Sequence, residues 1–127
     1  MIDLALSPLL LAQPAVTALV GNAIYPEELP DDAALPAITY RLVGVTAGPT
    51  WETAGMYRYR VQFDCWALTA LAAVNLRNAL VASLNGFVGA AGGVNIQNAQ
   101  VATIGDFYQH EAMQYRRMVD FYFLSTS

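Results

Sequence analysis

The sequence has no lysine, one cysteine (Cys65) and one histidine (His110) among its 127 residues. Charged residues make up 13 % of the chain, whereas about 25 % is usual in soluble domains. All six basic residues are arginines, and ten acidic residues leave a formal charge of -4. Because affinity for phosphate grows with the number of basic side chains, this composition argues against a general nucleic-acid-binding protein.

A single cysteine excludes an intrachain disulfide and a zinc site made of several cysteines, so the expected folding compartment is the cytoplasm. The stretch from Leu4 to Pro26 carries no charge, but Pro8, Pro14 and Asn22 interrupt it. It therefore predicts neither a membrane span nor a signal peptide.

Hydrophobic residues make up 56 % of the chain, and its length suits one domain, 1–127, with one sizeable core. A chain this apolar and this poor in charge is expected to bury surface against other subunits. The acidic residues Glu27, Glu28, Asp31 and Asp32 fall within six positions of the proline-containing segment 22–35. We expect that segment to be an exposed, extended connection.

The expected order of elements is helix, strand, strand, helix, strand, strand. Ser7-Pro8 and Gln13-Pro14 predict the starts of two short helical pieces that end near Gly21. Alternating patterns predict four strands, and an alanine- and leucine-rich run predicts one long helix. The strands are expected over 37–43, 56–66, 94–104 and 113–124, and the helix over 67–84. This is an α+β domain, in which one long helix packs on a mostly antiparallel, four-stranded sheet.

The predicted helix 67–84 has hardly any charged face. Leu80 falls on the side that carries most of its leucines, whereas Leu71 falls opposite, among Asn75 and Asn78. A helix that is apolar on most sides is buried on most sides. We therefore expect it to pack on the sheet and also against another subunit, with Leu71, Asn75 and Asn78 at that interface.

The chain offers few groups for catalysis, which needs converging titratable side chains. Asp106, His110 and Glu111 share a polar loop, but their spacing is not typical of a metal site, and a solvated turn is the commoner structure. Cys65 falls on the aromatic face of its strand, where a packed thiol is expected in place of a nucleophile. We expect no enzymatic activity, no cofactor and no metal.

The arginines share strand faces with acidic residues. The residues concerned are Arg58, Arg60 and Asp64 on one strand, and Arg116 and Asp120 on another. Cross-strand ion pairs, intersubunit ion pairs and a solvated sheet face are all compatible with this pattern. Arg77 falls among the helix leucines, so its charge either reaches solvent or meets an acid.

Two predicted loop tips carry aromatic residues. Trp51 and Glu52 lie in the tip of the first hairpin, where a large ring is expected to contact a partner. The second tip, over 106–111, carries Phe107, Tyr108 and His110. The candidate interface therefore comprises both tips, the outer side of the helix and Arg116.

Four motifs occur in a fixed order along nearly the whole chain: VGNAIYP at 20–26, LPAITY at 35–40, YRVQFDCWA at 59–67, and DFY at 106–108 with YRRMVDF at 115–121. With this order and spacing, the chain resembles the tail-completion or tail-terminator proteins of long-tailed phages. Related proteins occur in prophages and gene transfer agents.

The resemblance implies a homohexameric ring on the end of the tail tube, which stops tube polymerisation and offers a surface to the head-side connector or stopper protein. It implies a structural protein of the virion, made in the host cytoplasm, with DNA passing through the lumen without specific binding. Two other classes stay open. One is a small dimeric enzyme or ligand-binding domain, with Tyr57, Tyr59 and Tyr115 lining a pocket, and the other is a regulatory adaptor.

Overall fold

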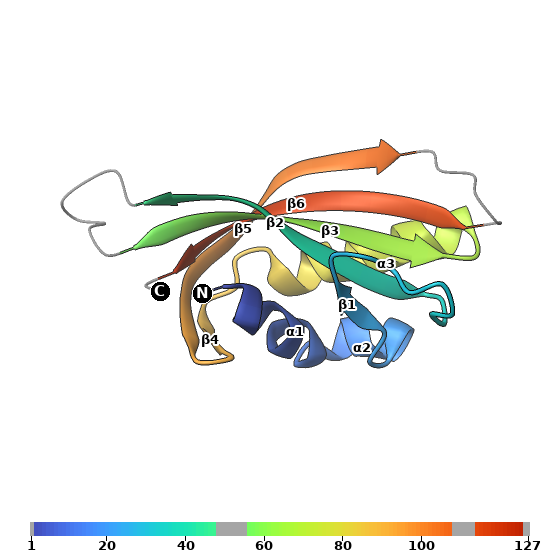
Figure 1. The fold of residues 1–127 in the computed structure, drawn as a ribbon, viewed down its shortest axis with the longest axis horizontal. Coiled ribbons are helices and arrows are strands. Elements are labelled where there is room, and N and C mark those ends of the chain that lie inside the picture. Colours follow the sequence, from blue (N-terminus) through green and yellow to red (C-terminus); the bar gives the residue numbers. More distant parts are fainter. Residues whose placement is uncertain (1, 48–55, 108–113, 126–127) are drawn as a thin grey trace.

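The computed structural model describes residues 2–47, 56–107 and 114–125 of the chain (Figure 1). Its elements are α1 (Asp3–Leu11), α2 (Pro14–Val20), β1 (Ile24–Pro26), β2 (Ala37–Ala47), β3 (Tyr57–Ala67), α3 (Ala70–Leu84), β4 (Gly89–Ala91), β5 (Val94–Phe107) and β6 (Tyr115–Ser125).

The strands form one six-stranded sheet in the order β1-β2-β3-β6-β5-β4. Only β1 and β2 run parallel, and every other neighbouring pair is antiparallel. The α+β class is confirmed, but the expected number of four strands is wrong. The four expected strands form the middle of the sheet, and two three-residue strands extend it at the edges.

The two added strands lie where loops were expected. β1 falls inside the acidic connection 22–35, and β4 falls inside the glycine-rich segment 89–93. Figure 1 shows both short strands turned down beside α1, so that the sheet curls around the helices.

The N-terminal segment forms two short helices, as expected. α2 begins at Pro14 and ends before Gly21, whose φ of 62° closes the helix. Pro8, however, lies inside α1 and does not start a helix, because α1 begins at Asp3.

All three helices cover one face of the sheet (Figure 1). Tyr59, Phe63 and Phe121 are fully buried beneath them, and the rings of Phe63 and Phe121 meet edge to face with centroids 5.7 Å apart. Leu76 and Leu80 of α3 are fully buried as well. Burial of these large apolar side chains is the main force that holds α3 on the sheet.

No helix of the described residues lies on the other face of the sheet. The side chains of Arg58, Arg60, Gln62, Asp64 and Trp66 alternate with the buried residues of β3 and are all partly or fully exposed. We call this surface the open face. Within the described residues, no helix has both the length and the apolar character needed to cross a membrane.

Candidate interaction surfaces

Two ion pairs join neighbouring strands on the open face. Arg60 on β3 lies 2.9 Å from Asp120 on β6, and Arg116 on β6 lies 3.0 Å from Asp64 on β3. The hydrogen bond to Asp120 raises the pKa of the Arg60 guanidinium. Of the arrangements that the sequence left open, the structure shows cross-strand ion pairs, and each pair joins β3 to β6.

Two arginines of the open face lie against aromatic rings. The guanidinium of Arg58 lies 4.8 Å from the ring centroid of Tyr122, and that of Arg116 lies 5.4 Å from the ring centroid of Trp66. The Trp66 indole N–H donates to the Thr39 hydroxyl at 3.0 Å. Arg60 and Arg116 are poorly placed to bind phosphates, because their charges already face the carboxylates of Asp120 and Asp64.

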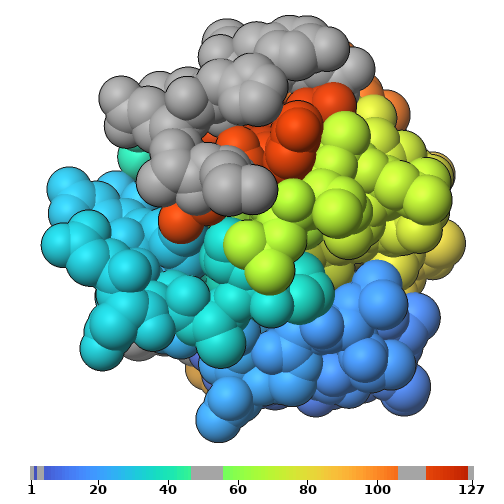
Figure 2. Space-filling view, turned by 90° about the vertical axis from the view of Figure 1, so that its right-hand side faces the viewer, coloured from blue at the N-terminus to red at the C-terminus, as the bar shows by residue number. Residues whose placement is uncertain are grey.

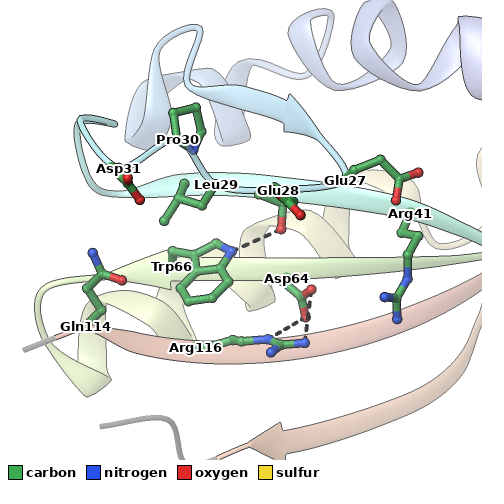
Figure 3. Close-up of a pocket in the computed structure, with 11 residues that line it drawn as sticks. Glu27, Glu28, Leu29, Pro30, Asp31, Arg41, Asp64, Trp66, Gln114 and Arg116 are labelled. Atoms are coloured by element: carbon green, nitrogen blue, oxygen red, sulfur yellow. Dashed lines mark hydrogen bonds and ion pairs between the residues drawn. The ribbon is translucent and has the colours of Figure 1, made fainter. Parts of the chain in front are cut away.

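A groove of about 550 Å³ lies at one end of the open face (Figure 3). One wall comes from the acidic connection before β2, and the floor comes from β2, β3 and β6. Its lining residues are Glu27, Glu28, Leu29, Pro30, Asp31, Thr39, Arg41, Asp64, Trp66, Gln114 and Arg116. We call it the acidic groove.

The groove was not predicted from the sequence, although its acidic residues stand out there. Four acids lie within six positions, with no basic residue between them, and that was the signal available. Among the carboxylates that line the groove, Asp64 is in an ion pair, with Arg116, and none of Glu27, Glu28 and Asp31 is in one with a described residue. Arg41 on the floor adds a second arginine to the groove, but four lining carboxylates outnumber the two lining arginines, and the wall made by Glu27, Glu28 and Asp31 is negative.

The outer side of α3 is exposed and uncharged. Leu71 is 70 % exposed, and both Asn75 and Asn78 are exposed, as predicted for that side of the helix. Arg77, the one charged residue in α3, is partly buried, and its Nη1 donates to the carbonyl oxygen of Gly105 at 3.3 Å. The outer side of α3 therefore exposes a leucine to solvent and carries no charged side chain that would favour its hydration.

The two long edges of the sheet differ. Along β5, the carbonyl of Ala99 accepts from the N–H of Gly86 at 2.6 Å, and the N–H of Val101 donates to the Asn85 side chain at 3.2 Å. Along β2, β1 reaches as far as Tyr40, whose carbonyl accepts from the N–H of Glu27. Beyond Tyr40, no described segment pairs with the outer edge of β2. The edge of β5 is thus covered at Ala99 and Val101 by the end of α3 and the residue after it, whereas the edge of β2 beyond Tyr40 has no described partner.

The structure places some of the predicted interface residues and not others. Arg116 lies in the acidic groove, and Leu71, Asn75 and Asn78 lie together on the outer side of α3, away from it. Phe107 ends β5. The remaining predicted interface residues lie outside the described part of the chain: Trp51, Glu52, Tyr108 and His110.

Cys65 is fully buried in the core, as expected for a packed thiol. Burial raises the pKa of the Cys65 thiol, because a thiolate would lose its hydration there. Among the residues that the structure describes, no group of three His, Cys, Asp or Glu side chains could hold a metal ion.

Comparison with known proteins gives one family and one fold. The fold is similar to that of a chain in the solved virion of a native gene transfer agent (GTA) particle, with a TM-score of 0.69 and 16 % identity over 95 % of this chain and 91 % of that one. No curated protein matches the sequence. A family model described as "Tail completion protein gp17" matches residues 5–125, and the chain therefore belongs to that family of tail completion proteins.

Proposed function

We propose that this protein is a structural component of a phage or phage-like tail, which forms a ring of six copies on the end of the completed tail tube. The ring stops tube polymerisation and joins the tail to the connector or stopper protein on the head side. The observation that carries the proposal is the family match over residues 5–125, nearly the whole chain. The fold shared with a chain of a gene transfer agent virion supports it.

The surface of α3 supports assembly into a ring. Leu71 is highly exposed beside Asn75 and Asn78, and the outer side of the helix carries no charge. Isolated subunits usually present charged side chains on an exposed helix face. The outer side of α3 is therefore our candidate for contact between subunits.

The open face supports a role without catalysis or tight DNA binding. Arg60 and Arg116 face Asp120 and Asp64, and the negative formal charge of -4 opposes adhesion to phosphates. DNA would pass through the lumen of such a ring without being held. The protein would be made in the host cytoplasm and remain in the finished virion, at the junction of tail and head.

Electron microscopy of particles made with and without the protein tests this function. We expect tails of irregular length and unjoined heads when the protein is absent, and a six-fold ring at the head-proximal end of the tube when it is present. Native mass spectrometry at micromolar concentration, with and without tail tubes, counts the copies. Tails of normal length that join heads without the protein would contradict the proposal.

A further inference from the structure

The β2–β3 hairpin extends past the helices at one end of the molecule (Figure 1). Every residue from Val43 to Thr46 is exposed, and so are Tyr57 and Arg58 opposite them. Val43 is 51 % exposed and Val45 is 43 % exposed. We call residues 43–46 with 57–58 the arm. Because consecutive residues are exposed, neither face of the arm is covered by the described part of its own subunit.

The arm is basic at Arg58. Its guanidinium lies over the Tyr122 ring, and within the described residues it makes no ion pair with a carboxylate. Arg60, two residues further along β3, differs because it is paired with Asp120. Arg58 therefore carries a charge that a carboxylate of another molecule could neutralise.

The acidic groove lies at the opposite end of the long axis. The acidic connection and Trp66 are at the end where β2 begins and β3 finishes, whereas the arm is at the end where β2 finishes and β3 begins (Figures 1 and 3). Figure 2, which looks onto the groove end, shows the segment that contains the acidic connection, in cyan, standing out on the left, with the start of β2, in teal, between it and β3. One end of the subunit thus offers exposed valines and an arginine without an ion pair to a described carboxylate, and the other offers a hollow in which four carboxylates outnumber two arginines.

We infer that the arm of each subunit docks in the acidic groove of the next copy, with Arg58 facing Glu28 and Asp31. The contact joins two different patches, at opposite ends of the subunit, so it is head-to-tail. Such a contact produces a closed ring when the rotation from one subunit to the next adds up to a full turn. Charge complementarity selects the second copy as the occupant, because the groove wall is negative and the arm is positive. This inference rests on the proposed ring and adds the pair of surfaces that would join its subunits.

A charge exchange tests the contact. We expect R58E or E28R alone to require at least about tenfold more protein for ring formation on tail tubes, because each places like charges together. The double variant R58E/E28R should assemble like the wild type, since the opposite charges face each other again. A18E, a change at an exposed position of α2 that belongs neither to the arm nor to the groove lining, is the control for added negative charge. Unfolding curves verify that each variant is folded.

Covalent trapping gives a second readout. A T46C/D31C variant, oxidised in assembled tails, should yield linked oligomers up to the whole ring, while the buried Cys65 stays unreacted. Normal rings with no linked oligomers and no effect of R58E would overturn the arm contact and leave the proposed function standing. A wild-type protein that forms no ring on tail tubes would overturn the proposed function and this inference with it.

Discussion

Arg60 donates through both Nε and Nη2 to the same carboxylate oxygen of Asp120, at 3.1 and 2.9 Å. The Asp120 side chain is only 8 % exposed, and its other oxygen, Oδ1, has no hydrogen-bond partner among the described residues. Asp120 therefore depends on Arg60 for the stabilisation of its buried charge.

This dependence predicts a difference between two neighbouring arginines. R60A should lower the melting temperature more than R58A, because only R60A leaves a buried carboxylate without its cation. The two positions lie on the same strand and the same face, so R58A is a matched control. Thermal unfolding at neutral pH measures the melting temperatures of both variants. Equal decreases in melting temperature would contradict the role assigned to the Arg60–Asp120 pair.

The two sides of α3 predict opposite phenotypes. L80A removes a fully buried side chain and should cost about 2 to 5 kcal/mol of unfolding free energy. L71D changes an exposed side chain and should alter that free energy by less than about 0.5 kcal/mol, yet hinder assembly. Denaturant unfolding and the mass of the assembled oligomer separate the two effects. If L71D leaves both oligomer mass and tail completion unchanged, the outer side of α3 is not an interface.

Because the Cys65 thiol is buried, we expect it to react slowly with thiol reagents. Burial raises its pKa and closes it to solvent, so a thiol reagent at neutral pH should label it only when the protein opens. Labelling with and without denaturant, followed by mass spectrometry, measures this. Rapid labelling of the folded protein would show that Cys65 is accessible.

No metal or catalytic role is expected for the lone His110 and Cys65. The double variant H110A/C65A should keep particle assembly near the wild-type level, apart from the small stability cost of a cavity at position 65. Infectivity or gene-transfer assays measure particle assembly, and metal analysis of the purified protein checks for a bound ion. A stoichiometric metal that disappears with H110A would contradict this expectation.

Trp51 remains a prediction from the sequence, because it lies outside the described residues. W51A should give a folded protein that fails to complete tails or to join them to heads. Loss of a central aromatic anchor typically costs about 2 kcal/mol or more in binding. Circular dichroism checks folding, and electron microscopy of particles checks assembly. Normal particles made with W51A would remove Trp51 from the interface.

Periodicity predicted the elements that are long enough to show it. Tyr59, Val61 and Phe63 alternate with polar residues along β3, and the pattern identified both the strand and its buried face. β1 and β4 have three residues each, too few for a period. β1 is a strand because it pairs in parallel with β2, which lies on the other side of the acidic connection in the sequence. No local sequence pattern indicates that this pairing occurs.

The candidate interaction surfaces were likewise predicted where a local pattern exists and missed where distant segments must meet. The sequence indicated which arginines and acids share a face, because alternation along one strand decides it. It did not indicate that Arg60 meets Asp120, since this depends on how β3 and β6 align, with Gln62 opposite Asp120. The acidic groove was missed for a related reason: it forms only when the connection before β2 folds beside Trp66 and Arg116.

The covered edge of β5 limits how copies of this protein can aggregate. Fibrils that grow by strand addition need a subunit with two adhesive edges, one for each neighbour. Here Asn85 and Gly86 occupy backbone groups of Val101 and Ala99 in the middle of the β5 edge, whereas no described segment pairs with β2 beyond Tyr40, so β2 is the edge more open to strand addition. Two copies joined through their β2 edges would offer a third copy only the partly covered edge of β5, which disfavours growth beyond the pair.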